Sequence, residues 1–219
     1  MRLKWTGIGA ALILLTFMLI HGTVESASLQ IGLSWTFSKL APYLLQFVVV
    51  VLLSSILAQL FGLNFAKKKL IMLSSIVVFS GIAFAVNPIY EGDFDNSFDE
   101  VIIKNNGNDF EVGLTMVALP GCRYCYDRIE TLNSLKKYQQ NIPITVVMIS
   151  GDSIAMADYS EKLSSEINVI PATNEKQLSQ IVRGSFPAFI YKKEDVPFLY
   201  HWNQIGFGSG ALDWITEDN

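Results

Sequence analysis

Apolar positions follow two different patterns along this chain of 219 residues. Before residue 88 they form three nearly uninterrupted runs, at 7–21, 42–66 and 70–86. Runs that are apolar on all sides are typical of helices in lipid, and the second and third are long enough to cross the hydrocarbon core of a bilayer. The pattern predicts an all-α membrane segment over 1–87.

The first run is the shortest of the three and fits two alternatives. It follows Arg2 and Lys4, as does the apolar part of a signal peptide, and Ser26-Ala27-Ser28 is then a candidate cleavage site. It also fits a short spanning helix that stays attached as a signal anchor. The segment is therefore expected to have two or three transmembrane helices.

After residue 88 charged and polar positions return at the density of a water-soluble domain. Residues 88–97 combine turn formers and acids without any period and are predicted to be a linker. Residues 98–219 alternate between strand-like and helix-like patterns, which indicates an α/β domain with a mixed sheet. We expect strands at 101–104, 110–119, 144–149, 167–170, 188–192 and 197–202, and helices at 126–138, 154–165, 174–183 and 211–216. Asn106-Gly107 predicts that the first two strands form a hairpin.

Basic residues predict the orientation of the membrane segment. Arg2 and Lys4 precede the first run, and Lys67-Lys68-Lys69 separate the second from the third. Such clusters stay on the cytoplasmic side. The chain is therefore expected to be a multi-pass protein of the cell inner membrane, with its C-terminal domain in the periplasm or extracytoplasmic space, whether or not the first run is cleaved.

Composition agrees with a membrane protein and excludes one class of partner. Hydrophobic residues make up 51% of the chain, and the mean hydropathy is +0.36. The net charge is −4, and the sequence has no basic cluster with interleaved aromatic residues. We therefore expect the lipid bilayer as a partner and no nucleic acid.

The chemistry of the chain is concentrated in its only two cysteines, Cys122 and Cys125. They lie in a Cys-x-x-Cys unit between the strand that ends at Leu119 and the following helix. A helix N-terminus favours a thiolate over a thiol, and Arg123 acts in the same direction. The pattern indicates thiol-disulfide exchange, in which the first cysteine attacks and the second resolves the mixed disulfide.

Other uses of the cysteine pair remain open. A purely structural disulfide is one, although closing so short a loop restrains the unfolded chain little. Two thiolates could also hold a soft monovalent ion such as Cu(I). A closed zinc site needs four ligands, and only His21 and His201 could complete it. No metal or other cofactor is therefore expected beyond the redox-active disulfide.

Two motifs resemble the thioredoxin-like superfamily. Cys122-Arg123-Tyr124-Cys125 at a strand-to-helix turn is similar to its active-site motif, and Gly184-Ser185-Phe186-Pro187-Ala188 is similar to its cis-proline loop. The resemblance covers about 95–219 and is greatest to the membrane-tethered, extracytoplasmic TlpA/ResA branch. It implies that Pro187 lies against the cysteine pair and that Phe186 offers backbone groups to the substrate. The membrane segment loosely resembles helical proteins of the DoxX/MauE group.

The sequence also departs from that superfamily. Gly121 stands where thioredoxins have a tryptophan, and Arg123 and Tyr124 replace their Gly-Pro dipeptide. Because residues between the cysteines tune the stability of the thiolate, the direction of electron flow does not carry over. The absence of a histidine from the motif, in contrast to strong oxidants of the DsbA type, favours a reductant.

The leading hypothesis is a membrane-anchored thiol-disulfide oxidoreductase. Its partners would be protein disulfides or dithiols and a separate membrane or extracytoplasmic electron donor, since the membrane segment has no cysteine to relay electrons. The alternative is a thioredoxin-like module that binds copper or a client protein without turnover. A domain that only scaffolds neighbouring membrane subunits is a third hypothesis.

Overall fold

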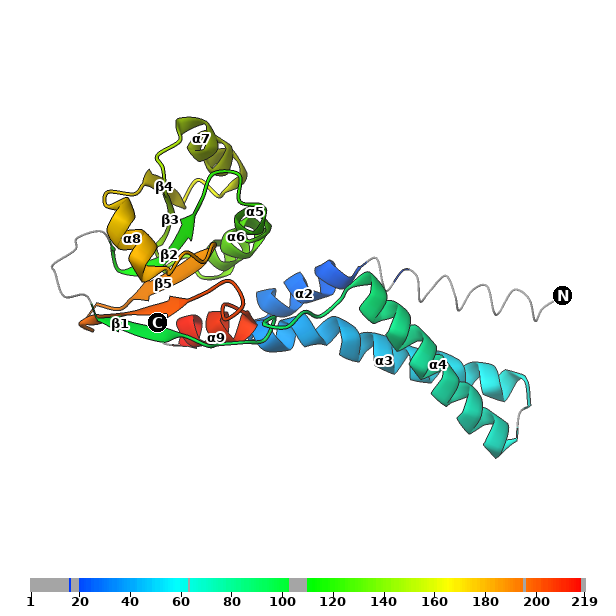
Figure 1. Ribbon diagram of the computed structural model, residues 1–219. Helices are drawn as coiled ribbons and strands as arrows, with labels where there is room; N and C mark the ends of the chain where they lie inside the picture. Colours follow the sequence, from blue (N-terminus) through cyan, green and yellow to red (C-terminus); the bar gives the residue numbers. More distant parts are fainter. Residues whose placement is uncertain (1–15, 17–19, 63, 103–109, 195, 218–219) are drawn as a thin grey trace. The chain divides into compact units, whose positions relative to one another are not determined.

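The computed structural model describes most of the chain: residues 16, 20–62, 64–102, 110–194 and 196–217. The chain divides into two compact units, Met1–Tyr90 and Glu91–Asn219. Figure 1 shows helices in the first and a mixed sheet with helices in the second.

Three helices form the described part of the first unit: α2 (His21–Gln30), α3 (Trp35–Leu60) and α4 (Phe65–Val86). By length and composition α3 and α4 could cross a membrane, with mean hydropathies of 2.3 and 2.1. Only 22% and 6% of these apolar stretches is buried within the chain, so most of their apolar side chains face outward. Most of the predicted first helix, 7–21, lies outside the described residues.

Side-chain caps set where the two long helices begin. The Ser34 side chain accepts a hydrogen bond from the Phe37 N–H at 3.2 Å, so α3 begins before Pro42, the predicted start, and contains that proline. The Asn64 side chain accepts from the Lys67 N–H at 3.2 Å. The three lysines 67–69 are therefore the third to fifth residues of α4 rather than lying between the helices.

The second unit is built on a six-stranded sheet of order β1-β6-β5-β2-β3-β4. Its strands are β1 (Asp99–Ile102), β2 (Gly113–Ala118), β3 (Ile144–Met148), β4 (Asn168–Pro171), β5 (Ala188–Lys192) and β6 (Phe198–Trp202). β2, β3 and β4 are parallel, whereas β5, β6 and β1 each pair antiparallel with their neighbour. The predicted mixed sheet is confirmed.

The predicted hairpin between the first two strands is wrong. β1 pairs with β6, with Val101 opposite Leu199, and lies at an edge of the sheet. β2 has β3 on one side and β5 on the other. Both of its hydrogen-bonding edges are therefore occupied, which leaves no place for β1.

Helices connect and flank the strands: α5 (Arg123–Asp127), α6 (Ile129–Tyr138), α7 (Ser153–Lys162), α8 (Glu175–Ile181) and α9 (Ser209–Glu217). Leu178 of α8 packs with Val117 and Ile190 on one face of the sheet. Trp214 of α9 packs against Tyr200 and Trp202, with ring centroids 4.6 and 5.7 Å apart. Leu199 belongs to the first cluster and its neighbour Tyr200 to the second. Because successive side chains of a strand point to opposite faces, the sheet is covered on both faces.

The predicted linker is bonded to the start of α9. The Ser209 N–H donates to the Asp93 carbonyl at 2.8 Å, and the Ala211 N–H donates to the Asp95 carbonyl at 3.2 Å. Gly208 makes this approach possible, because an added Cβ would meet the Gly92 carbonyl oxygen and lie 2.7 Å from the Asp95 nitrogen. The missing side chain at Gly208 thus allows two backbone segments to pack directly on each other.

We expect Gly208→Ala to lower the free energy of unfolding of the second unit by more than about 2 kcal/mol, because backbone atoms must move apart. The measurement is urea unfolding of the detergent-solubilised chain, followed by tryptophan fluorescence. Gly151→Ala is the matched control, with φ +51° and its nearest contact at 3.7 Å. Strain alone should cost the control about 1 kcal/mol. Equal losses in the two variants would contradict the packing argument.

His201 on β6 predicts a pH dependence of stability. Its side chain is buried, and within the described structure Nε2 has no hydrogen-bond partner. Burial lowers the pKa of His201 below 6.5, and Arg183 acts in the same direction, whereas Asp99 opposes it. The unfolded chain therefore binds the proton more readily, so stability falls as the pH drops through the unfolded pKa and levels off below the folded one.

We expect His201→Leu to reduce the loss of stability between about pH 7.5 and pH 5.5, because the unfolded chain then gains one proton fewer. Urea unfolding at both pH values measures this loss for the wild type and the variant. An unchanged difference would show that His201 does not carry the effect.

Candidate functional site

The cysteine pair lies where the central strand leaves the sheet. β2 ends at Ala118, and after the turn the Cys122 N–H donates to the Leu119 carbonyl at 3.3 Å. Gly121 has φ +70°, a conformation that a residue without Cβ adopts readily. The turn therefore delivers Cys122 to the start of α5.

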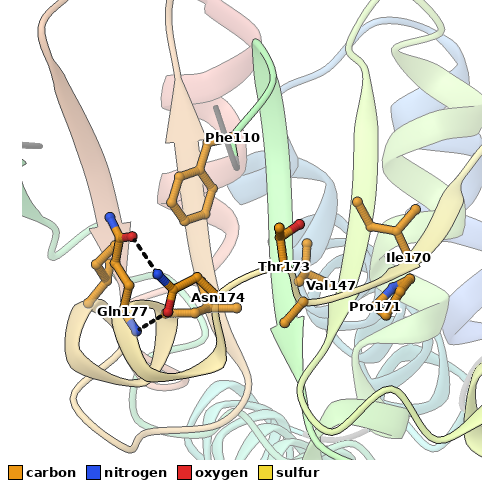
Figure 2. A pocket seen from close by; sticks show the side chains of 10 residues that line it. Phe110, Val147, Ile170, Pro171, Thr173, Asn174 and Gln177 are labelled. Atoms are coloured by element: carbon orange, nitrogen blue, oxygen red, sulfur yellow. Dashed lines mark hydrogen bonds between the residues drawn. The ribbon is translucent and has the colours of Figure 1, made fainter. Parts of the chain in front are cut away.

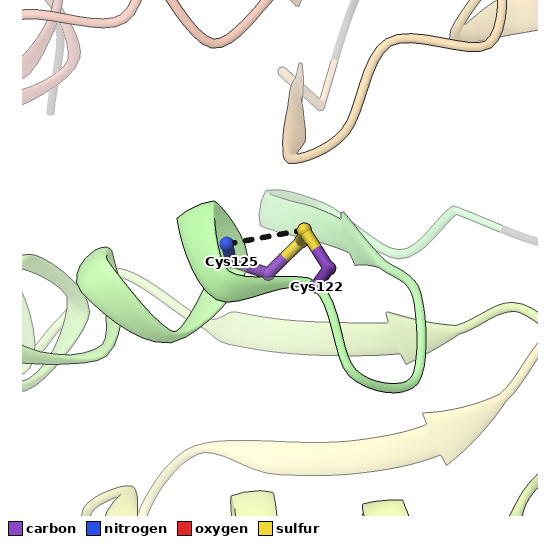
Figure 3. Close-up of a disulfide and its surroundings, with 2 residues drawn as sticks. All are labelled: Cys122 and Cys125. Atoms are coloured by element: carbon purple, nitrogen blue, oxygen red, sulfur yellow. Dashed lines mark hydrogen bonds between the residues drawn. A yellow bond between two sulfur atoms is a disulfide. The ribbon is translucent and has the colours of Figure 1, made fainter.

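Cys122 and Cys125 form a disulfide, with Cα atoms 5.3 Å apart (Figure 3). Cys122 is the N-cap of α5, and its Sγ accepts a hydrogen bond from the Cys125 N–H at 3.2 Å. An N-cap sulfur that faces a backbone N–H is stabilised as an anion. The same contact would favour the Cys122 thiolate after reduction.

The two sulfur-bearing residues differ in access to solvent. Cys122 is partly exposed, whereas Cys125 is fully buried. An attacking thiol must reach another protein, while a resolving thiol needs to reach only its neighbour. Cys122 is therefore the outer sulfur and Cys125 the inner one. Their predicted roles as attacking and resolving thiols stay predictions.

The two residues between the cysteines point to solvent. Arg123 is exposed, and the Tyr124 side chain is 59% exposed. In the described part of the chain neither side chain makes a hydrogen bond or an ion pair. Their predicted influence on the thiolate stays a prediction, and their exposure makes them available to a partner.

The sheet register brings the proline loop to the same edge as the cysteines. Ala188, the first residue of β5, pairs with Val117. Pro187 therefore adjoins the end of β2 that leads to Cys122. Pro187 is buried, the Phe186–Pro187 peptide bond is cis, and Phe186 packs partly buried against the core under α8. The roles predicted for Phe186 and Pro187 in substrate binding stay predictions.

Sequence reasoning missed a polar cluster that begins directly after Cys125. The Tyr126 hydroxyl donates to Oδ2 of Asp158 on α7 at 2.7 Å, and Lys162 donates to the same oxygen at 2.8 Å. The hydrogen bond to Asp158 is the main cause that raises the pKa of Tyr126 to about 12. Hydrogen bonds from Lys162, and then from Tyr126, hold the pKa of Asp158 below 3.8.

A second missed contact lies at the end of α5. Nη2 of Arg128 donates to the Gln204 carbonyl at 3.0 Å, in the loop between β6 and α9. Burial lowers the pKa of Arg128, while Asp93 and Asp127 oppose the shift. Asp158 and Lys162 could have been noticed as a pair spaced four apart on a predicted helix. Nothing in the sequence indicates that Arg128 contacts a loop so far along the chain.

The described residues offer two further observations on binding. They contain no group of three or more His, Cys, Asp or Glu side chains that could hold a metal ion. A pocket opens between α8 and the ends of β3 and β4 (Figure 2). Its wall is mostly apolar, with Asn174 and Gln177 at one side, and none of the predicted site residues lines it.

Comparisons with known proteins add no relative: no protein-family model, no curated protein and no solved structure matches this chain.

The difference in burial predicts selective labelling of the reduced pair. We expect iodoacetamide to modify Cys122 at least about ten times faster than Cys125 at about pH 7, because only the outer sulfur is both accessible and stabilised as an anion. Peptide mass spectrometry after brief labelling of the reduced, folded chain measures the ratio. Equal labelling would contradict the assignment, and labelling in denaturant is the control for intrinsic reactivity.

Proposed function

We propose that the chain is a membrane-anchored thiol-disulfide oxidoreductase of the thioredoxin-like superfamily. The observation that carries the proposal is the asymmetry of the disulfide: Cys122 is partly exposed at the start of a helix, and Cys125 is buried behind it. A structural disulfide gains nothing from one reactive, accessible sulfur. Exchange with another protein requires one.

The arrangement around the disulfide supports the thioredoxin-like assignment. A parallel strand pair, β2 and β3, flanks the cysteine helix in the sequence. An antiparallel strand, β5, then begins with a cis proline next to the end of β2. A hairpin to β6 and a closing helix α9 complete the unit. This order agrees with the succession of strands and helices that the sequence pattern predicts.

The reaction proceeds by two exchanges of sulfur partners. The Cys122 thiolate attacks a client disulfide, a mixed disulfide forms, and the first client sulfur leaves as a thiolate. The Cys125 thiolate then attacks Cys122, the internal disulfide forms, and the second client sulfur leaves. The client gains two electrons and takes up two protons, and the pair loses the same two electrons. Phe186 and Pro187 would hold the client backbone.

The membrane segment would hold this chemistry at a bilayer. α3 and α4 would cross the inner membrane, and Lys67-Lys68-Lys69 near the start of α4 would stay in the cytoplasm. Since α4 then runs outward, the unit that begins at Glu91 lies in the periplasm or extracytoplasmic space. A disulfide persists in such an oxidising compartment.

The direction of exchange that we favour is reduction of clients. No histidine lies between the cysteines to stabilise the reduced form as in strong oxidants. A reductant needs a dithiol to reduce it in turn. The chain has no third cysteine, so a separate membrane or extracytoplasmic protein must donate the electrons.

The proposal predicts which variant traps clients. We expect Cys125→Ser to accumulate mixed disulfides with extracytoplasmic proteins, because the attacking sulfur remains and the resolving one is lost. Non-reducing gels of membranes that contain the tagged chain would show adducts that disappear with a reductant. Cys122→Ser is the matched control, and it should give few adducts because Cys125 is buried.

Purified wild-type chain should also exchange disulfides with glutathione disulfide and with a disulfide-bonded peptide, and Cys122→Ser should abolish both reactions. Absence of exchange by the wild type would overturn the proposal. Stoichiometric binding of Cu(I) by the reduced chain, without exchange, would favour the copper-binding module instead.

A further inference from the structure

The helix that carries Cys125 is short and interrupted. α5 ends at Asp127, and the Arg128 N–H donates to the Cys125 carbonyl at 3.2 Å before α6 begins at Ile129. The bond spans three residues instead of four, so the helical ladder changes at this point. A five-residue helix is not stable by its own backbone bonds. Contacts outside α5 must therefore help to fix the turn around Cys125.

The first such contact lies directly after Cys125. The Tyr126 hydroxyl donates to Asp158 at 2.7 Å, and the Tyr126 ring packs on the buried ring of Tyr159 at 4.5 Å. Lys162 bonds to the same carboxylate and lies 4.6 Å from the centre of the Tyr126 ring. Because its pKa is about 12, Tyr126 stays protonated as a donor over the physiological range. One side of the cysteine turn is thus tied to α7.

The second contact lies at the break itself. Arg128 donates to the Gln204 carbonyl at 3.0 Å. The loop that offers this carbonyl is itself held, because Oδ1 of Asn203 accepts from the N–H groups of Ile205 at 3.0 Å and Gly206 at 2.8 Å. The Ser97 N–H also donates to the Gly206 carbonyl at 3.3 Å. Arg128 therefore bonds to a fixed point on the opposite side of the turn.

The positive charge of Arg128 does not explain why this residue lies next to the cysteine helix. Asp93 and Asp127 lie near enough to favour its charged form. Both carboxylates oppose the positive potential that the guanidinium adds at the cysteine pair. What Arg128 adds is geometry, because its hydrogen bond joins the end of the cysteine helix to a rigid loop.

We propose that Tyr126 and Arg128 are positioning residues that hold Cys125 within reach of Cys122 for the resolving step. The inference rests on the proposed exchange function. In that step the Cys125 thiolate attacks the Cys122 sulfur, a bond forms between the two sulfurs, and the client thiolate leaves and takes a proton. Its rate and equilibrium depend on the effective concentration of one sulfur at the other, which two anchors on either side of the turn would raise.

The test measures this effective concentration. Full-length chain in detergent is equilibrated with mixtures of reduced and oxidised glutathione, and the fraction of internal disulfide is determined after acid quenching. We expect the double variant Tyr126→Phe, Arg128→Met to lower the equilibrium constant for forming the internal disulfide about tenfold, which moves the midpoint potential about 30 mV to a less negative value. Each single substitution should lower this constant about threefold, since two independent anchors contribute additively in free energy.

Matched variants separate positioning from general loosening. Asn133 ties α6 to the end of α7, with bonds of 2.9 Å to the Lys162 carbonyl and 2.7 Å from the Ser164 N–H. Asn133→Ala should weaken this interface yet change the glutathione equilibrium less than about twofold, since it lies beyond the break. Arg128→Lys keeps a donor and should recover part of the loss. Tryptophan fluorescence and urea unfolding identify any variant that fails to fold, and Tyr126→Phe removes only one oxygen.

Kinetics separate this inference from the proposed function. With Cys125→Ser, adding the two substitutions should leave attack on a disulfide-bonded peptide and the pH profile of Cys122 alkylation unchanged. With both cysteines present, the mixed disulfide should last about ten times longer than in the wild type. If the wild type exchanges disulfides and the double variant matches it in equilibrium constant and in mixed-disulfide lifetime, the positioning inference is wrong while the proposed function stands. The positioning inference is also wrong if Asn133→Ala shifts the equilibrium as much as the double variant does. If the wild type does not exchange at all, the proposed function fails first.

Discussion

The arrangement of the site depends on one strand whose two edges are both occupied. β2 pairs parallel with β3 and antiparallel with β5. Its parallel partner requires the chain to cross back over the sheet, and the cysteine helix is part of that crossover. Its antiparallel partner begins with Ala188 opposite Val117, which sets Pro187 beside the exit toward Cys122. A single strand thus brings together two motifs that are far apart in the chain.

Local patterns in the sequence were sufficient to predict the elements around this strand. The apolar run that ends at Leu119 and the turn at Gly121 predicted β2 and the cysteine turn. The periodicity predicted one helix over 126–138, which the structure divides at Arg128 into α5 and α6. β5 was predicted with the bounds that the structure has, 188–192. In each case the side chains that decide the conformation are close in sequence, so their spacing carries the information.

Contacts between distant segments could not be predicted in this way. Asn106-Gly107 indicated a hairpin, yet the partner of β1 is chosen by the free edge of β6, which lies almost a hundred residues later. The segment after Gly92 has the composition of a linker, but its carbonyl groups accept from the N-terminal amides of α9. Arg128 is ordinary for a helix surface, yet it bonds to the Gln204 carbonyl in a distant loop. Composition describes a segment alone, whereas these roles depend on what packs against it.

The two units of the chain would contribute differently to the proposed electron transfer. Within the first unit, Gln46 of α3 is buried and donates to the Phe79 carbonyl at 3.2 Å, so its polar group joins α3 to α4. Buried side-chain amides of this kind hold apolar helices together in lipid, where no water competes for them. Because both cysteines of the chain lie in the second unit, thiol chemistry cannot pass through α3 or α4. The described helices are therefore suited to anchoring, and the proposed exchange would need electrons that reach Cys122 from another molecule.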